Sequence, residues 1–430
     1  MTDPNPTPQS GTPVWQPSGT TPPPAPFPYQ PPVAQPPYQA GWAQAPYQPG
    51  PPQPPYQPGP PQPPYQQGFP PQQGPFPYQP PVQQYPYQPG LAPYPAVGGW
   101  QQGAPVAYQP VPIKPSALPV EPKRHSQFLQ TPRRRWWKLP IALIVAGVAW
   151  LIGSTIVTIP ALVYDVINQR IDLTDPVALQ NYVAGITTHI TPALFLANNA
   201  GIALMIPCAW LGLIIYGQRP RWLSSVVGGL RWGWLFRILG LILIPYIALE
   251  ALTVALGGVP QLTWKPYSLF MIFVILLTTP LQCAGEEYGL RGLVNRLFGS
   301  YGSSRVSFWI GGVVSSLAFM WLHAAQDMYL NAFYFSFGMI SCWMAWRTGG
   351  LEAGIALHVV NNVLSMAVLP FSDFSRLFDR QAGSAGVMDV FPLVIVLLAS
   401  MGLVEWQVRR RKPVAVAAPG AADGQRLALS

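Results

Sequence analysis

The last two thirds of the chain consist largely of apolar segments about as long as a bilayer is thick. A helix rises about 1.5 Å per residue and needs about 20 apolar residues to cross the hydrocarbon core. Eight such segments are predicted, at residues 139–163, 191–216, 234–256, 268–285, 306–325, 329–346, 352–370 and 388–405. Their apolar residues are continuous rather than alternating, which favours helices over membrane-spanning strands. We therefore expect an all-α polytopic membrane protein with about eight transmembrane helices in a bundle, over residues 136–406.

Composition and charge exclude several classes of soluble protein. Charged residues make up 9% of the chain, far below the roughly 25% of a typical soluble domain. The net charge of +9 does not indicate nucleic-acid binding, because the basic residues flank the apolar segments rather than forming a patch on a folded surface. The three cysteines have neither disulfide nor zinc-ligand spacing, so we interpret them as packing residues. They are Cys208, Cys283 and Cys342.

Residues 1–135 are rich in proline, glutamine and tyrosine and contain almost no leucine or isoleucine. In part of this stretch a tyrosine recurs every nine residues, at Tyr29, Tyr38, Tyr47, Tyr56 and Tyr65. Proline at this density blocks both helix and sheet and favours extended polyproline II. We predict a disordered cytoplasmic tail that is either a solvated spacer or a ligand for a polyproline-binding partner. A second disordered tail, basic in character, is predicted at residues 407–430.

The distribution of basic residues predicts the orientation of the chain. A basic cluster at 133–138 precedes the first apolar segment, and another at 409–412 follows the last. The loops on the opposite side carry few basic residues, namely Arg170, Lys265, Arg376 and Arg380. Loops rich in lysine and arginine stay in the cytoplasm. An even number of spans with this bias predicts a multi-pass protein of the plasma (inner) membrane with cytoplasmic N- and C-termini.

Three groups of polar residues interrupt the later apolar segments. An ionisable side chain at membrane depth costs several kcal/mol unless it is paired or faces water, so each group is a candidate site. Glu286 and Glu287 end the fourth segment, and Arg291 follows about one helical turn later. Glu287 and Arg291 are four residues apart and are expected to pair, which leaves Glu286 as the candidate general base. The alternative is a salt-bridge cluster where a span meets its loop.

The other two groups supply imidazole and amide side chains. His323 lies four residues after Phe319, near the end of the fifth segment. His358 and Asn362 share one face of the seventh segment and are placed to donate two hydrogen bonds to one oxygen, as oxyanion stabilisation requires. Each group alone also fits a structural role, as a buried histidine or an interhelical hydrogen bond. Together they describe the attack of water on an amide carbonyl. The neighbouring Asn361 is interpreted as a packing residue.

The spacing of these residues resembles that of a family of membrane proteases. Residues 286–291 (Glu-Glu-Tyr-Gly-Leu-Arg) match the Glu-Glu-x-x-x-Arg motif of the CPBP intramembrane protease family. That family includes the CAAX prenyl endopeptidases of the Rce1 type and bacterial proteins linked to bacteriocin processing and self-immunity. Residues 319–323 match its second motif, Phe-x-x-x-His, and residues 358–362 match its third, His-x-x-x-Asn. Three motifs in order make the resemblance specific, and it covers roughly residues 139–406.

This resemblance implies a fold, an activity and a site. The implied fold is a helical bundle whose active site is recessed in the membrane and open toward the cytoplasm. The implied activity is that of a glutamate-dependent endopeptidase without a cofactor, acting on a membrane-associated peptide or protein. Glu286 would activate water with help from His323, and His358 and Asn362 would hold the oxyanion. The other two charged residues of the first motif would support this geometry.

Other interpretations remain open at this point. Glu286, His323 and His358 have the composition of a zinc site with two histidines and one carboxylate, although the chain has no His-Glu-x-x-His pair. A non-catalytic membrane scaffold or immunity protein would act through the tail. A small transporter would use Glu250 in the third segment; otherwise we expect Glu250 to take a buried hydrogen bond. If Glu286 and His323 share a water, their nearest heavy atoms lie roughly 3–6 Å apart.

Overall fold

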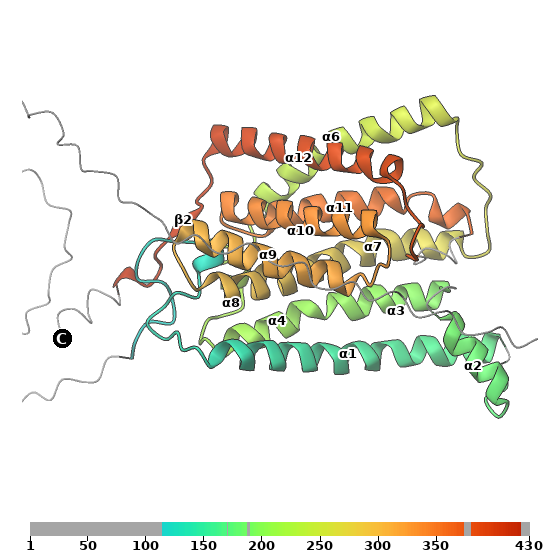
Figure 1. The fold of residues 1–430 in the computed structure, drawn as a ribbon, viewed down its shortest axis with the longest axis horizontal. Helices are drawn as coiled ribbons and strands as arrows, with labels where there is room; N and C mark the ends of the chain where they lie inside the picture. Colours follow the sequence, from blue (N-terminus) through green and yellow to red (C-terminus); the bar gives the residue numbers. More distant parts are fainter. Residues whose placement is uncertain (1–113, 170, 187–189, 374–379, 423–430) are drawn as a thin grey trace, which may run out of the picture. The chain divides into compact units, whose positions relative to one another are not determined.

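A computed structural model describes residues 114–422, apart from residues 170, 187–189 and 374–379. Residues 1–113 of the predicted N-terminal tail, with its tyrosine repeat, lie outside the described residues, as do residues 423–430 of the predicted C-terminal tail. The described part is a bundle of long helices whose axes are roughly parallel (Figure 1).

In order along the chain, the elements are β1 Lys123–Arg124, η1 His125–Gln127, α1 Lys138–Asn168, α2 Pro176–Gly185, α3 Pro192–Ala203, α4 Met205–Ile214, α5 Arg221–Ser224, α6 Trp232–Gly257, α7 Ser268–Glu286, η2 Glu287–Val294, α8 Asn295–Gly299, α9 Ser304–Leu322, α10 Met328–Thr348, α11 Glu352–Ser365, η3 Leu369–Phe371, α12 Val387–Arg411 and β2 Val416–Ala417. The segment η2 is a π-helix, and η1 and η3 are 3₁₀-helices.

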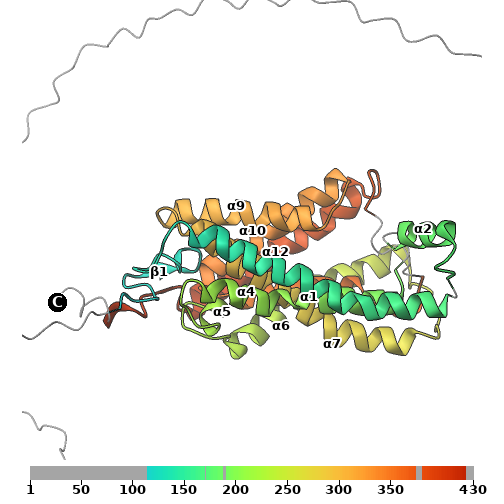
Figure 2. The ribbon, with the colours of Figure 1, turned by 90° about the horizontal axis from the view of Figure 1, so that it is seen from below.

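The chain enters and leaves the bundle at the same end. The short strands β1 and β2 pair antiparallel, with Lys123 opposite Ala417 and Arg124 opposite Val416. Figure 2 shows β1 at one end of the helices and α2 at the other. We call the end that holds β1 and β2 the terminal end and the opposite one the far end. Because both flanking segments lie at the terminal end, the chain crosses the bundle an even number of times.

All eight predicted segments are helical. Seven helical stretches are long and apolar enough to cross a membrane, namely Lys138–Asn168, Pro192–Ile214, Trp232–Gly257, Ser268–Gly299, Ser304–Leu322, Glu352–Phe371 and Val387–Arg411. The eighth predicted segment, at 329–346, is α10, a helix of 21 residues that is more polar than the others. Because β1 and β2 pair at one end, α10 must also traverse the bundle, where α9, α11 and α12 pack around it.

The helix that carries the glutamates continues well beyond them. We expected Glu286 and Glu287 to lie where the fourth span meets its loop, and that expectation is wrong. The chain remains helical from Ser268 to Gly299 through α7, the π-helical turn η2 and α8. The apolar run stops at the glutamates, but the helix does not: Glu287 contacts His358 on α11, and Arg296 donates to the carbonyl oxygens of Trp222 and Leu223. Single-turn π-helical segments are often found at functional sites.

Residues 114–137, most of which were predicted as disordered tail, form a folded collar on the terminal end. Phe128 and Leu129 are completely buried. Gln218 donates hydrogen bonds from its side-chain amide to the carbonyl oxygens of Ala117 and Phe128. The guanidinium of Arg296, at the end of the long helical run, lies 5.2 Å from the ring of Phe128. These few apolar residues in a polar stretch are too weak a sequence signal to predict the contact. By contrast Glu250, expected to be buried, is exposed on α6.

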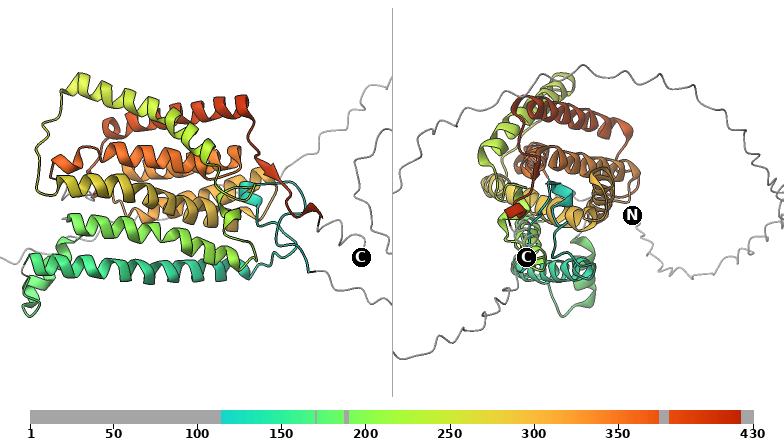
Figure 3. Two further views of the ribbon diagram at one scale, coloured as in Figure 1. Left: turned by 180° about the vertical axis from the view of Figure 1, so that it is seen from behind. Right: turned by 90° about the vertical axis from the view of Figure 1, so that its left-hand side faces the viewer.

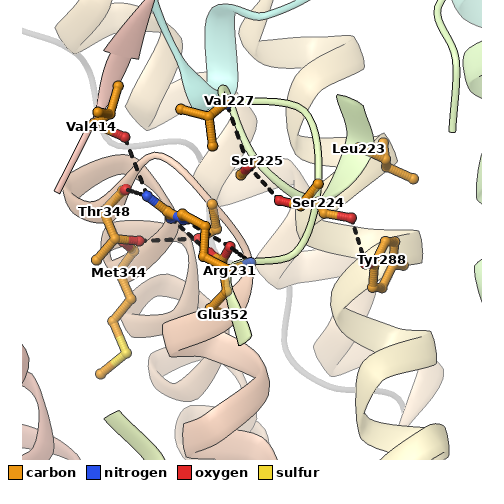
Figure 4. A network of polar contacts seen from close by, with 12 residues as sticks. Leu223, Ser224, Ser225, Val227, Arg231, Tyr288, Met344, Thr348, Glu352 and Val414 are labelled. Carbon is orange, nitrogen blue, oxygen red and sulfur yellow. Dashed lines mark hydrogen bonds and ion pairs between the residues drawn. The ribbon is translucent and has the colours of Figure 1, made fainter. Parts of the chain in front are cut away.

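An ion pair between Arg231 and the buried carboxylate of Glu352 links three connections at the terminal end (Figure 4). Arg231, just before α6, bonds Glu352 at the start of α11 through its backbone N–H and through Nε and Nη2, at 2.9, 2.9 and 2.7 Å. Its Nη1 donates to the carbonyl oxygens of Thr348 and Val414. The carboxylate of Glu352 is fully buried. This network joins the loop before α6, the turn between α10 and α11, and the segment after α12.

Removing the buried carboxylate should therefore destabilise the terminal end. We expect E352A to lower the free energy of unfolding by about 3 kcal/mol, because the partly buried side chain and the backbone N–H of Arg231 lose their acceptor. The matched control is E405A. Glu405 pairs with Arg347 on α10 in a partly exposed site, so its loss should cost about 1 kcal/mol or less. Unfolding of the detergent-solubilised protein measures both, and equal effects would contradict this assignment.

The collar should also make stability depend on pH. His125 is buried in η1, and burial, with help from the nearby charges of Arg296 and Arg231, holds the pKa of its imidazole well below the usual 6.5. Below pH 6.5 the unfolded chain binds a proton that the folded state excludes, so stability is present above that pH and falls as pH drops. Between pH 7 and pH 5 we expect a loss of about 2 kcal/mol.

Thermal unfolding of the wild type and of H125Q across this pH range checks the prediction. The variant should lose this part of the pH dependence, because glutamine does not titrate. An unchanged slope in H125Q would show that another group is responsible.

Candidate active site

The acidic residues of the first motif lie inside the bundle. Glu286 is the last residue of α7 and Glu287 begins η2. Glu286 keeps 9% of its surface exposed, whereas Glu287 and Arg291 have none. Oε1 of Glu287 lies 3.4 Å from Nη1 of Arg291, which is the ion pair that their four-residue spacing predicts. The Arg291 guanidinium also lies 4.2 Å from the ring centroid of Phe319 on α9. Of the two carboxylates, Glu286 is thus the one with access to open space.

His358 on α11 bridges the two glutamates. Its Nε2 lies 3.1 Å from Oε2 of Glu286, and its Nδ1 lies 3.2 Å from Oε1 of Glu287. An imidazole donates from both ring nitrogens only when it is protonated. Sequence reasoning grouped His358 with Asn362 and did not anticipate this contact. The approach of α11 requires a small residue, because a side chain at Gly354 would come within 2.6 Å of Oε2 of Glu287.

His323 caps the far end of α9. Its Nδ1 lies 2.8 Å from the carbonyl oxygen of Phe319, one turn earlier. A carbonyl oxygen only accepts, so Nδ1 must carry the hydrogen and, in the neutral ring, Nε2 is the acceptor. The ring packs against Tyr334 of α10, with centroids 4.0 Å apart, and Arg380 donates to the His323 carbonyl oxygen. The tautomer and the orientation of this imidazole are therefore both fixed by its neighbours.

Asn362 is held in a chain of amides. Its Oδ1 accepts from Nδ2 of Asn361 at 3.0 Å, and its own Nδ2 donates to Oε1 of Gln282 at 3.3 Å. Oδ1 of Asn361 in turn accepts from the hydroxyl of Tyr246 on α6. These bonds determine which atom of the Asn362 amide is the donor. Asn361, interpreted from the sequence as a packing residue, orients its neighbour.

Sequence reasoning missed polar residues on α3 and α7. Gln282 lies one turn before Glu286 on α7, and both face the same cavity; a glutamine four residues before the motif was the available signal. Asn199 on α3 donates to the hydroxyls of Thr278 and Thr279 on α7, at 2.9 and 3.2 Å. The pair of asparagines at 198–199 in an otherwise apolar segment also signalled a polar surface. Both asparagines line the cavity.

One cavity joins most of the predicted site. It has a volume of about 630 Å³ and is lined by residues of α1, α3, α7, α11 and the end of α9. Three of the four residues predicted to be catalytic, Glu286, His323 and Asn362, line it. His358 lies behind Glu286, away from the lining, and the Glu287–Arg291 pair lies deeper still. The cavity can hold a water and a peptide group next to a carboxylate, an imidazole and an amide donor.

The alternative zinc site would join Glu286, His323 and His358. Among the described residues, no group of three or more His, Cys, Asp or Glu side chains is placed to hold a metal ion. Both nitrogens of His358 face carboxylate oxygens, and Nδ1 of His323 carries the hydrogen bonded to Phe319. A metal bound by these residues would replace the contact between Nε2 of His358 and Glu286, while the Nδ1 contacts to Glu287 and Phe319 would remain.

Comparison with known proteins identifies the region that carries the site. Residues 266–364 match the family model described as Type II CAAX prenyl endopeptidase Rce1-like. The match extends from just before α7 through nearly all of α11, and it contains all three motifs. No curated protein and no solved structure matches the chain. The resemblance recognised from the motifs is confirmed over residues 266–364: this part of a multi-pass membrane protein matches the model of Rce1-like CAAX prenyl endopeptidases.

Proposed function

We propose that the protein is an intramembrane endopeptidase in which Glu286 activates water for peptide-bond hydrolysis. The observation that supports this most directly is the cavity that Glu286 shares with His323 and Asn362. A carboxylate at the base of a water-accessible cavity, next to an imidazole and an amide donor, has the groups that amide hydrolysis needs. The Rce1-like domain, whose family consists of proteases, supports the same reaction class.

In this proposal the carboxylate is the general base. Oε2 of Glu286 faces His358, which leaves Oε1 for a water in the cavity. As the water oxygen attacks the carbonyl carbon, its proton passes to Glu286. The C–N bond then breaks, and the proton is delivered to the leaving amine nitrogen. Nε2 of His323 accepts a hydrogen bond from the second O–H of the water and so orients the water. The separation of roughly 3–6 Å between His323 and Glu286 stays a prediction.

Asn362 is the proposed oxyanion donor. Its Nδ2 borders the cavity, and the bond from Asn361 keeps that donor pointing away from Asn361. The sequence paired His358 with it in this role, but the contacts of His358 support a different one. His358 contacts Glu286 and Glu287 at once, so it is better placed as a positioning residue. Glu287, which pairs with Arg291, fixes the orientation of His358.

The cavity suits a membrane-associated peptide. The first turn of α3 and the segment before it give an apolar lining, with Ile186, Ile190, Leu194 and Phe195, whereas Asn198 and Asn199 further along α3 are polar. The opposite side carries the polar groups. An extended peptide would bury apolar side chains on the first wall and present its backbone to the second. We further propose that the terminal end faces the cytoplasm of the plasma (inner) membrane, because the basic residues gather there.

Replacing the base should abolish the reaction without unfolding the protein. We expect E286Q to lower cleavage of a membrane-tethered reporter at least about 100-fold, because an amide does not accept the proton. The matched control is E250Q, since Glu250 is exposed on α6 and should keep full activity. Equal thermal stability of both variants shows that folding is unaffected.

Cleavage retained by E286Q would contradict the assigned base. Chelator treatment separates the metal alternative, because a reaction that needs no metal keeps its rate after removal of zinc. Loss of activity on chelation, restored by zinc, would contradict the proposed mechanism.

Removing the oxyanion donor should lower kcat with little change in KM. We expect N362A to lose about 100- to 1,000-fold in kcat, because the bond is made only to the charge of the transition state. N361A serves as the comparison, since it removes the residue that orients Asn362 but keeps the donor, and its loss should be smaller. A larger effect on KM than on kcat would assign Asn362 to substrate binding instead.

A further inference from the structure

The mouth of the cavity is built at the far end of the bundle. The α8–α9 turn lies under the collar, where the side chains of Gln127 and Gln130 donate to the Gly302 carbonyl oxygen. The helix α9 therefore starts at the terminal end, and His323, which follows it, lies at the far end. Gln326, also in the lining, follows in the α9–α10 connection.

The other residues at the mouth come from neighbouring far-end connections. Ile186 and Ile190 lie between α2 and α3, and Arg380 precedes α12. These connections are joined to each other: the backbone N–H of Gln326 donates to the Arg380 carbonyl oxygen, and Asp327 accepts from the N–H of Gly383. The left view of Figure 3 shows α2 at the end away from the strand and the C-terminal segment.

The path from the terminal end to Glu286 is filled. The eight residues of η2 and the five of α8 continue below the carboxylate, and Glu287, Arg291 and Arg296 are completely buried there. Arg296 donates from Nη1 and Nη2 to the carbonyl oxygens of Trp222 and Leu223. The collar covers the terminal end of this helical run, where the buried ring of Phe128 packs against Arg296. Among the described residues, the open space that reaches Glu286 comes from the far end.

Charge places the two ends on different sides of the membrane. The terminal end carries the basic residues Lys123, Arg124, Arg133, Arg134, Arg135, Lys138, Arg219, Arg221, Arg231, Arg296, Arg305, Arg347, Arg409, Arg410, Arg411 and Lys412. Among the described residues of the far-end connections, the basic ones are Lys265 and Arg380. Cytoplasmic ends of membrane helices carry the excess of lysine and arginine. The far end therefore faces away from the cytoplasm.

Two expectations from the sequence thus conflict. The resemblance implied a site open toward the cytoplasm, and the charge pattern implied cytoplasmic termini. Both hold only if the cavity opens at the end that carries β1, β2 and the basic residues, whereas its far-end lining, with Gln326 and Arg380, lies at the opposite end. The charge pattern is the stronger guide to orientation, because it is a direct property of this chain.

We propose that the protease takes its substrate from the non-cytoplasmic face of the membrane. The substrate class in this inference rests on the proposed function, but the side on which the cavity opens does not depend on it. The substrate class is then a peptide segment with apolar side chains presented at the outer face of the bilayer. A lipid-modified peptide at a cytoplasmic C-terminus would reach only the closed, collar-covered end.

Cysteine labelling tests which side the cavity faces. The native cysteines Cys208, Cys283 and Cys342 are buried, so an added exposed cysteine gives the signal. In intact cells, a membrane-impermeant maleimide should label S384C, in the exposed far-end segment before α12, and Q326C at the mouth. The matched control S303C, exposed in the α8–α9 turn, should react only after the membrane is permeabilised. Labelling of S303C but not S384C or Q326C in intact cells would overturn the proposal.

Two reporters then separate this inference from the proposed function. One presents a cleavable segment on the outer face next to a membrane anchor, and the other presents the same segment in the cytoplasm. The wild type should cut the outer reporter and not the inner one, and E286Q should cut neither. Cleavage of the inner reporter alone would overturn the side of entry while supporting the protease. Cleavage of neither, with labelling of the far end from outside, would refute the proposed reaction and leave the side of opening established.

Discussion

The structure depends on the satisfaction of charged side chains at the centre of an apolar bundle. Glu287, Arg291 and His358 are buried together, and Glu286 joins them to the cavity. An isolated charge in such a place is costly, and removing one partner of a buried pair leaves the other uncompensated. With a protonated imidazole the four groups carry no net charge. The cluster is therefore stable only as a set, which ties α11 and η2 to one relative position.

That constraint also shapes the cavity. Because the fourth membrane helix continues through the cluster as a π-helix and then α8, the carboxylates lie within the bundle instead of at its surface. The side of Glu286 that faces the far end remains open, with Gln282 one turn above it. The opposite side is filled by Arg291 and Arg296. The cavity gives Glu286 access to water, while Glu287 and Arg291 remain buried behind it.

The helical frame and the polar cluster act at different ends of the molecule. The collar, the β1–β2 pair and the Arg231–Glu352 network fasten the terminal end. They make no contact with the cavity and would hold the helices in register while the far end admits a substrate. A hydrolytic site needs both properties, because the reacting groups must be held to a fraction of an ångström while a peptide enters and leaves.

The sequence by itself predicted the eight helices and the resemblance at residues 266–364, since apolar length and residue spacing are properties of the chain. It determined the Glu287–Arg291 pair too, because residues four apart on a helix meet. Tertiary structure alone decided that His358 binds both glutamates and that Gln282 joins Asn362, since those contacts join elements about 70 to 80 residues apart. It also decided that the fourth helix runs on beyond Glu286 and that the cavity extends from Glu286 toward the end opposite β1 and β2. Hydropathy cannot tell a helix that ends from one whose polar residues find partners on its neighbours.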